Sequence, residues 1–288
     1  MINKVKLFLG EDSKILRFID FVAFKLGYHA RRRRKFALNY YAEKISMISS
    51  WSKKRTENYN FYYDITEKNL IDLCHLMSTI FSLDYKVVYS YADELKSNKD
   101  LISFIHAEFE GDPKMKDARI AFARRIGWYI LIRITRPKLI VETGVHQGVG
   151  ALVITSALMK NIEEGSHGRY LGVDIDPKSG VLFKGEFAEV GQIMFGDSIE
   201  ILRGLKESVD LFISDSDHEK EYENNEYEAF LPLMSDNSVI ISDNSHANNV
   251  LANFSLRHNR NYFFFAESPL DHWYPGAGIG FSIAKKHN

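Results

Sequence analysis

Two polar clusters in the C-terminal half of the chain contain residues that could remove a proton from a hydroxyl group. Asp215-Ser-Asp-His218 follows one apolar segment, and Asp243-Asn-Ser-His246 follows the next. Carboxylate and amide oxygens gathered at one place suit a hard divalent cation such as Mg²⁺, and a histidine can act as a general base. A metal-bound hydroxyl loses its proton more readily, so the two clusters together favour activation of an oxygen nucleophile. Taken singly, each cluster is also typical of an ordinary polar loop.

A third polar segment has the features of a ligand-binding turn. Glu142-Thr-Gly-Val-His-Gln-Gly-Val-Gly150 follows the apolar run 139–141, and residues 151–158 can continue as a helix. Its glycines let a ligand approach bare backbone at a helix start, a position that favours nucleotide-like ligands. The acid Glu142 would repel a pyrophosphate and suits a cationic ligand better. The order of the glycines also differs from the G-x-G-x-x-G pattern of dinucleotide-binding proteins.

Acids end the next two apolar runs as well. Asp174 lies 30 residues beyond Gly144, and a carboxylate can accept hydrogen bonds from two vicinal hydroxyls. In NAD-dependent dehydrogenases the corresponding acid comes about 20 residues after the glycines. The spacing therefore disfavours NAD, which stays the alternative cofactor. Asp197 closes the following run, where ligand contact and N-capping of the next helix are both open to it.

Apolar segments of strand length must position these residues, and helical patterns such as 219–234 separate them. The alternation predicts a doubly wound α/β fold with a mostly parallel seven-stranded sheet, in which the polar clusters share the carboxyl edge. Pro177 predicts the start of a further helix. Too little chain separates the last two segments for a crossover helix, so we expect an antiparallel edge strand. The expected strands are 139–141, 169–176, 192–197, 209–215, 238–244, 261–266 and 280–284.

The segment from about residue 138 to 286 resembles a class I S-adenosylmethionine-dependent methyltransferase. The resemblance rests on Glu142 with the glycine turn, on the acid that ends the second strand, and on the order of strands and helices. It implies a Rossmann-like fold and S-adenosyl-L-methionine as the cofactor. It also implies that Glu142, Gly144 and Gly148 line the cofactor's amino-acid end, that Asp174 binds its ribose, and that Asp197 and Ser198 lie at its adenine.

Within that family the two acidic clusters resemble those of the metal-dependent O-methyltransferases of the catechol, caffeoyl-coenzyme A and macrocin types. By this resemblance Asp215, Asp243 and Asn244 bind Mg²⁺ or another divalent cation, and His218 is the general base. The catechol type has Lys at the position of the base and the macrocin type has His, which favours a sugar or glycoconjugate as the acceptor. A catechol or other phenol is the alternative acceptor. A non-methylating NAD-binding protein is the alternative outside this class of enzyme.

We expect two regions in the chain. Residues 1–113 read as a basic, mostly helical extension that caps the substrate side, and residues 114–288 as the cofactor-binding domain. Gly111-Asp-Pro113 marks the boundary between them. Hydrophobic periodicity predicts helices at 67–83, at 93–109 with a polar break near 97–100, and at 116–136.

The composition narrows the class of protein. The chain has 288 residues, 45% of them hydrophobic, which is enough for a substantial core. Its single cysteine, Cys74, excludes a disulfide within the chain and suits a reducing compartment. No run approaches the roughly 18 apolar residues of a membrane span, and the N-terminus lacks a signal-peptide core. We expect a cytoplasmic homo-oligomer with a small-molecule acceptor and no nucleic-acid partner.

Basic residues are concentrated at the N-terminus. Residues 1–60 contain 14 Lys or Arg and five Asp or Glu. The rest of the chain contains 23 Lys or Arg and 33 Asp or Glu. An apolar helical pattern over 15–26 precedes Arg31-Arg-Arg-Arg-Lys35. We expect this helix to pack on its own domain, with the arginines solvated or paired to acids. Peripheral contact with the anionic inner face of a membrane is the alternative.

Overall fold

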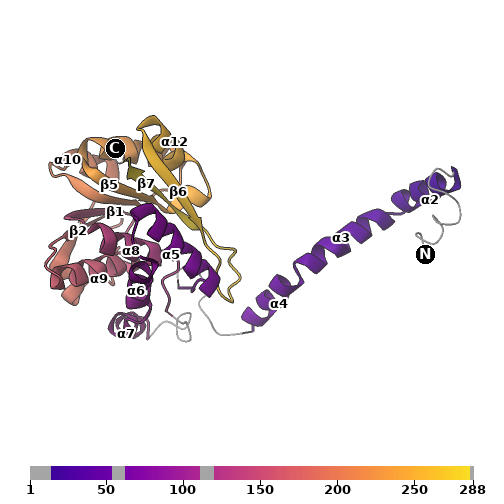
Figure 1. Ribbon diagram of the computed structural model, residues 1–288, viewed down its shortest axis with the longest axis horizontal. Helices are drawn as coiled ribbons and strands as arrows, with labels where there is room; N and C mark the ends of the chain where they lie inside the picture. Colours follow the sequence, from indigo (N-terminus) through magenta and orange to yellow (C-terminus); the bar gives the residue numbers. More distant parts are fainter. Residues whose placement is uncertain (1–13, 54–61, 111–119, 286–288) are drawn as a thin grey trace. The chain divides into compact units, whose positions relative to one another are not determined.

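The computed structural model describes residues 14–53, 62–110 and 120–285. The chain divides into two compact units between Lys54 and Arg55. The described part of the first unit contains the helices α2 (Lys14–Lys25), α3 (Tyr28–Tyr40) and α4 (Ala42–Trp51) (Figure 1). None of the side chains described in this unit is buried. The described core therefore belongs to the second unit.

A seven-stranded sheet forms the centre of the second unit, in the order β3-β2-β1-β4-β5-β7-β6. Strands β1 to β5 run parallel, and β7 lies antiparallel between β5 and β6. The predicted doubly wound, mostly parallel sheet is confirmed. The expected antiparallel pairing at this edge is confirmed, because the edge strand β6 pairs antiparallel with β7; the strand that runs against all the others, β7, is interior. The strands are β1 (Leu139–Thr143), β2 (Arg169–Asp174), β3 (Gly191–Phe195), β4 (Val209–Ser214), β5 (Met234–Ser242), β6 (Arg260–Ala266) and β7 (Gly278–Ala284).

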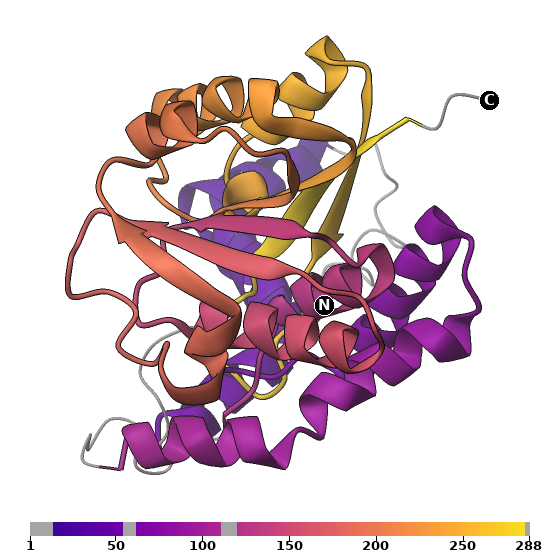
Figure 2. The same ribbon diagram turned by 90° about the vertical axis from the view of Figure 1, so that its left-hand side faces the viewer.

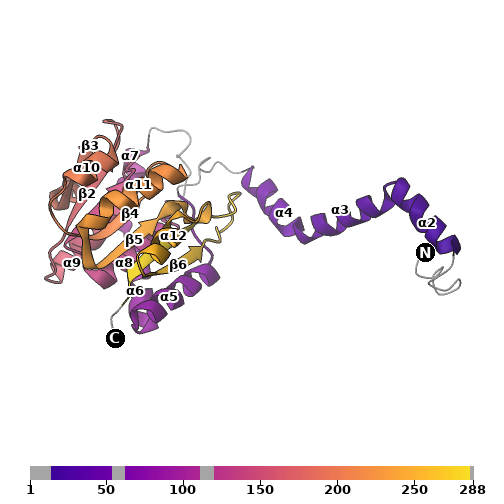
Figure 3. The same ribbon diagram turned by 90° about the horizontal axis from the view of Figure 1, so that it is seen from above.

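Helices cover both faces of the sheet because successive side chains of a strand point to opposite faces. In β1, Ile140 belongs to the core on one face, and Leu139 and Val141 to the core on the other. Helices α5 to α9 cover the first face (Figure 2), and α10, α11 and α12 cover the second (Figure 3). These helices are α5 (Glu67–Phe81), α6 (Tyr85–Lys96), α7 (Lys99–Glu108), α8 (Arg125–Thr135), α9 (Val149–Glu163), α10 (Ser198–Gly204), α11 (Lys220–Phe230) and α12 (Val250–Arg257).

Side-chain caps set where the helices before the sheet begin. Asp84 accepts a hydrogen bond from the amide of Lys86 at 2.7 Å, and Asn98 accepts one from the amide of Leu101 at 3.0 Å. The predicted helix at 93–109 is therefore two helices, α6 and α7, while the helix predicted at 67–83 is confirmed as α5. All three share a compact unit with the sheet. The predicted boundary at 111–113 lies outside the described residues.

Two other predicted helices differ from the structure. The helix predicted from residue 116 begins only at Arg125, and residues 120–124 are not helical. Ala123 has a φ of 46°, which a continuous α-helix cannot contain. Pro177 does not start an α-helix either, because it enters a turn that leads to the short 3₁₀-helix Gly185–Val190.

Candidate active site

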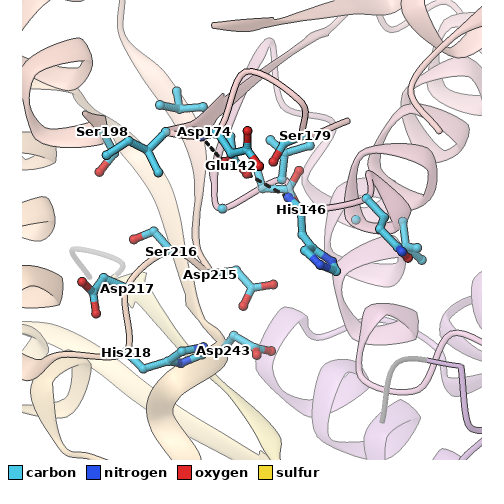
Figure 4. A pocket seen from close by; sticks show the side chains of 18 of the residues that line it. Glu142, His146, Asp174, Ser179, Ser198, Asp215, Ser216, Asp217, His218 and Asp243 are labelled. Carbon is cyan, nitrogen blue, oxygen red and sulfur yellow. Dashed lines mark hydrogen bonds between the residues drawn. The ribbon is translucent and has the colours of Figure 1, made fainter. Parts of the chain in front are cut away.

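A cavity of about 890 Å³ lies at the carboxyl ends of β1, β2, β4 and β5. Strand order reverses beside β1, and open α/β sheets bind their ligands at such a point. Loops from both halves of the sheet therefore reach the same cavity. Figure 4 shows Glu142, His146 and Asp174 in one part of it, and Asp215, His218 and Asp243 in another.

Gly144 brings the turn after β1 against the loop after β4. Its φ is 86°, and a Cβ at this position would lie 2.0 Å from the carbonyl oxygen of Asp215. Only glycine fits there, for conformational and steric reasons together. Gly144 lines the cavity. Gly148, predicted to line the cofactor beside it, is not among the lining residues and instead serves as the N-cap of α9 with a φ of 101°.

Glu142 is a buried carboxyl group at the end of β1. It is 1% exposed and accepts a hydrogen bond from the hydroxyl of Tyr170. A Cβ on Gly150 would lie 2.0 Å from Oε1 of Glu142, so this glycine makes room for the carboxyl group. Burial raises the pKa of Glu142 to about 7, although the Tyr170 hydroxyl and the charge of Arg125 act in the opposite direction. Glu142 therefore changes its charge near neutral pH.

Asp174 is fixed at the end of β2 by backbone amides. Its Oδ2 accepts a hydrogen bond from the amide of His146 at 2.9 Å, and its Oδ1 accepts one from the amide of Asp176 at 2.9 Å. Each carboxylate oxygen can accept a further hydrogen bond. Because Asp174 lines the cavity, its carboxylate is held in place to accept from hydroxyls of a ligand.

Asp197 both caps a helix and lines the cavity. Its Oδ1 accepts from the amide of Glu200 at 2.9 Å, which makes it the N-cap of α10, and its Oδ2 accepts from the hydroxyl of Tyr222 at 3.0 Å. Ser198 lines the cavity beside it and donates to Glu226 at 2.5 Å. The N-cap interpretation of Asp197 is thus confirmed, and its position leaves the ligand contact open as well.

Asp215 after β4 and Asp243 after β5 meet at the cavity wall, where Arg124 reaches them. Arg124 donates through Nε and Nη2 to the two carboxylate oxygens of Asp243, with 2.8 Å between Nη2 and Oδ2. Burial raises the pKa of Asp243, but the guanidinium outweighs it and holds that pKa below its usual range. Burial and the charge of Asp243 raise the pKa of Asp215 well above its usual range. The pKa values of the two acids therefore shift in opposite directions, and the guanidinium of Arg124 favours the charged form of Asp243.

Asn244 and His218 form a separate pair. The ring Nδ1 of His218 is hydrogen-bonded to Oδ1 of Asn244, and Nδ2 of Asn244 donates to the carbonyl oxygen of Asp217 at 3.4 Å. This second contact orients the amide so that its oxygen faces the imidazole. His218 lines the cavity, whereas Asn244 is buried and not among the lining residues.

Comparison with known proteins identifies the central part of the chain. Residues 141–245, which include the glycine turn and both acidic clusters, match a family model described as a methyltransferase domain. This part of the chain is a methyltransferase domain. A search of curated proteins found no match.

Solved structures with a similar arrangement are distant in sequence. An O-methyltransferase of Streptomyces achromogenes, solved with S-adenosylmethionine, is 15% identical over 70% of this chain and 96% of its own, with a TM-score of 0.47. A methyltransferase of Geobacter sulfurreducens is 16% identical over 70% of this chain and 99% of its own, with a TM-score of 0.49. An O-methyltransferase of Bacillus cereus, in complex with S-adenosylhomocysteine, is 15% identical over 69% and 97%, with a TM-score of 0.47.

The three residues predicted to bind a metal are not arranged to bind a divalent cation. Both oxygens of Asp243 accept hydrogen bonds from Arg124, whose positive charge would repel a metal ion at the same carboxylate, and the side chain of Asn244 is turned to His218. Asp215 shares a side-chain hydrogen bond with Asp243, and the charges of Arg124 and Arg125 act on it as well. Across the described residues, no group of three or more His, Cys, Asp or Glu could hold a metal ion.

Arg124 is the main site residue that the sequence did not reveal. It contacts Asp243 across 119 positions of the chain, a separation that hydrophobic periodicity cannot detect. It lies within the helix predicted at 116–136, and the pattern of that helix assigns it no role in the site. The aromatic residues Tyr62, Tyr222 and Tyr274 also line the cavity, and nothing in their local sequence distinguishes them from core residues.

Proposed function

We propose that the protein transfers a methyl group from S-adenosylmethionine to a hydroxyl oxygen of a small molecule, and that this acceptor is a sugar or glycoconjugate. The main support is the placing of Asp174 and Glu142 beside the glycine turn of a methyltransferase domain. Acids at this position suit a ligand that carries positive charge and vicinal hydroxyls. They suit the pyrophosphate of NAD poorly.

Three groups of residues would hold the cofactor. When bound, S-adenosylmethionine supplies an electrophilic methyl group on a positively charged sulfur. Glu142 can accept from its ammonium group, and Asp174 keeps lone pairs for the ribose hydroxyls. Asp197, Ser198 and Tyr222, which line the cavity, would lie at the adenine.

His218 is the proposed general base. Because the oxygen of Asn244 faces its Nδ1, that nitrogen carries the hydrogen and the lone pair is on Nε2. The proton of the acceptor hydroxyl would pass to Nε2 as the oxygen takes the methyl group and the bond between that group and sulfur breaks, which would leave S-adenosylhomocysteine. Asn244 is then the residue that sets the tautomer of the base, a role that replaces the predicted metal ligation.

The cofactor assignment is tested by calorimetric titration of the protein with S-adenosylhomocysteine and, separately, with NAD. We expect binding of S-adenosylhomocysteine and none of NAD. The reverse result would mean that the domain is not used for methyl transfer.

Replacement of the base tests the chemical step. His218→Ala should lower turnover by about 10²–10⁴-fold, the usual contribution of a positioned base, and leave the affinity for S-adenosylhomocysteine unchanged. His218→Lys should recover part of the loss. Near-native turnover of His218→Ala would exclude this residue as the base.

The acceptor class rests on the histidine in this position, by resemblance to the macrocin type. A panel of reducing sugars, nucleotide sugars and catechols, assayed for transfer of a labelled methyl group, separates the two proposed classes. Methylation of catechols and of no sugar in the panel would reject the sugar assignment while leaving O-methyl transfer in place.

A further inference from the structure

One nitrogen of the Arg124 guanidinium, Nη1, makes no hydrogen bond with the described residues. Arg124 is 6% exposed, and its Nε and Nη2 are occupied by Asp243. Its Nη1 is buried and has no hydrogen-bond partner among the described residues, although Arg124 lines the cavity. A buried N–H group without a partner is costly. A ligand in the cavity can satisfy it.

The backbone before Arg124 supports a role for this side chain. Ala123 has a φ of 46°, a conformation that costs a non-glycine residue about 1–2 kcal/mol. Such strain is retained where the surrounding structure requires it, commonly at functional sites. Here the conformation of Ala123 lies in the non-helical segment 120–124, just before α8 begins. Arg124, the next residue, is hydrogen-bonded to Asp243.

We propose that the Arg124 guanidinium takes the place of a divalent cation at this site, and that its Nη1 donates a hydrogen bond to the acceptor hydroxyl oxygen; this inference rests on the proposed function. The guanidinium supplies permanent positive charge and a donor fork that matches a carboxylate. The guanidinium neutralises the carboxylate of Asp243, as a metal ion would. It also stabilises the negative charge that develops on the acceptor oxygen. Methyl transfer by this protein then needs no metal.

Metal binding tests the proposal without an acceptor. Mn²⁺ is titrated into chelator-treated protein, with S-adenosylhomocysteine present, and followed by electron paramagnetic resonance. We expect no binding to the wild-type protein, with a Kd above about 1 mM. We expect Arg124→Ala to gain a Mn²⁺ site, because Asp243 then loses the guanidinium that is hydrogen-bonded to it and only the more distant charge of Arg125 still acts on the two acids. Arg133→Ala is the matched control, since Arg133 is 2% exposed and paired to Glu164 outside the cavity, and it should gain no site.

The wild-type titration decides the matter even if Arg124→Ala does not fold. Stoichiometric Mn²⁺ binding by the wild-type protein that Asp215→Asn abolishes would overturn the proposal. Failure of the wild-type protein to bind S-adenosylhomocysteine is a different result, because it rejects the proposed function and not the cation role of Arg124.

Chemical rescue tests the contact with the acceptor. With whichever sugar or phenol proves to be methylated, Arg124→Ala should lose on the order of 10²-fold or more in turnover. Methylguanidinium should restore more than about tenfold of that loss, whereas methylammonium, which lacks the planar fork, should restore less. Full activity of Arg124→Ala in the presence of chelator would contradict the proposal.

The first compact unit carries a second, independent feature, an apolar groove beside a basic cluster. A groove of about 350 Å³ is lined by apolar or aromatic side chains of α2 and the turn after it, including Phe18, Ile19 and Leu26. Phe18 is 67% exposed and Leu26 is 72% exposed. Arg31 to Lys35 follow on α3, all exposed. Apolar side chains next to clustered arginines are typical of segments that lie on anionic membranes.

We infer that this unit binds a membrane surface that contains anionic lipid headgroups. Charge complementarity favours this occupant over a second copy of the chain, because two copies would bring the same cluster of five positive charges together. The described residues contain no helix long and apolar enough to span a membrane. The expected contact is therefore at the surface.

Cosedimentation of the full-length protein with lipid vesicles tests this contact. We expect binding to phosphatidylcholine vesicles that contain phosphatidylglycerol, little binding to phosphatidylcholine alone, and release by salt. Replacement of Arg31, Arg32, Arg33 and Arg34 by Gln should weaken binding by up to about 10³-fold, since each charge near the surface contributes roughly 1 kcal/mol. The matched control replaces four exposed basic residues of the second unit by Gln, and it should leave binding unchanged. These residues are Lys86, Lys99, Arg203 and Lys206.

Two outcomes would overturn the membrane assignment. One is equal binding to neutral and anionic vesicles, or none to either. The other is a dimer in analytical ultracentrifugation that Phe18→Asp dissociates, which would show that a second copy of the chain covers the groove.

Discussion

Glu142 is a buried carboxyl group whose charge depends on pH near neutrality. Its pKa is raised from 4.5 to about 7 by burial, so the unfolded chain loses the proton at a lower pH than the folded protein does. Folding is therefore penalised as pH rises from about 4.5 to 7, and the penalty of up to about 3 kcal/mol remains above that range. A buried acid with this property at a cavity wall fits a binding role better than a stabilising one.

Removing the charge should reveal this penalty. We expect the urea midpoint of Glu142→Gln, measured against that of the wild-type protein, to be more favourable at pH 8 than at pH 5. At pH 8 only the wild-type protein carries the buried carboxylate. The same substitution should weaken binding of S-adenosylhomocysteine. Glu189→Gln, at an exposed position, is the control. Identical pH dependence in Glu142→Gln and the wild-type protein would show that the carboxyl group is not penalised by burial.

At the scale of elements, the turn after β1 depends on one glycine. Ala at position 144 would place Cβ 2.0 Å from the carbonyl oxygen of Asp215 at a φ of 86°. Gly165 offers a close control, because its φ is 84° and nothing lies within 4 Å of its Cβ position. Gly165→Ala should cost only the conformational penalty, about 1–2 kcal/mol. Gly144→Ala should cost clearly more and abolish cofactor binding, as measured by urea unfolding and calorimetry; equal effects of the two would remove the steric argument.

The same elements show what could be predicted from the sequence. Short apolar runs ending in acids gave β1, β2 and β4, because a buried parallel strand needs continuous apolar residues and an open sheet binds ligands at its carboxyl edge. The place of β7 inside the sheet was not predicted, since register between distant strands is a tertiary property. The pairing of Arg124 with Asp243 was missed for the same reason. That pairing changes the chemistry inferred for the site, because it engages the carboxylate of a residue that was predicted to bind a metal.

At the scale of the whole molecule, the two compact units have separate tasks in our interpretation. Both described apolar cores consist of residues from Tyr62 onward, and every residue that lines the methyltransferase cavity lies in the second unit. The first unit contributes exposed apolar and basic side chains instead. The second unit should therefore fold and bind its cofactor without the first.

Deletion of residues 1–54 tests this separation. We expect the remaining protein to unfold cooperatively with a Tm within about 4 °C of the full chain, since a change of 1 kcal/mol corresponds to about 2–4 °C in a domain of this size. Its affinity for S-adenosylhomocysteine should be unchanged, because no cavity residue is removed. Its binding to anionic vesicles should be lost. A deletion variant that loses its cooperative transition would show that the first unit contributes to the core, and one that still sediments with anionic vesicles would place the lipid-binding surface on the methyltransferase unit.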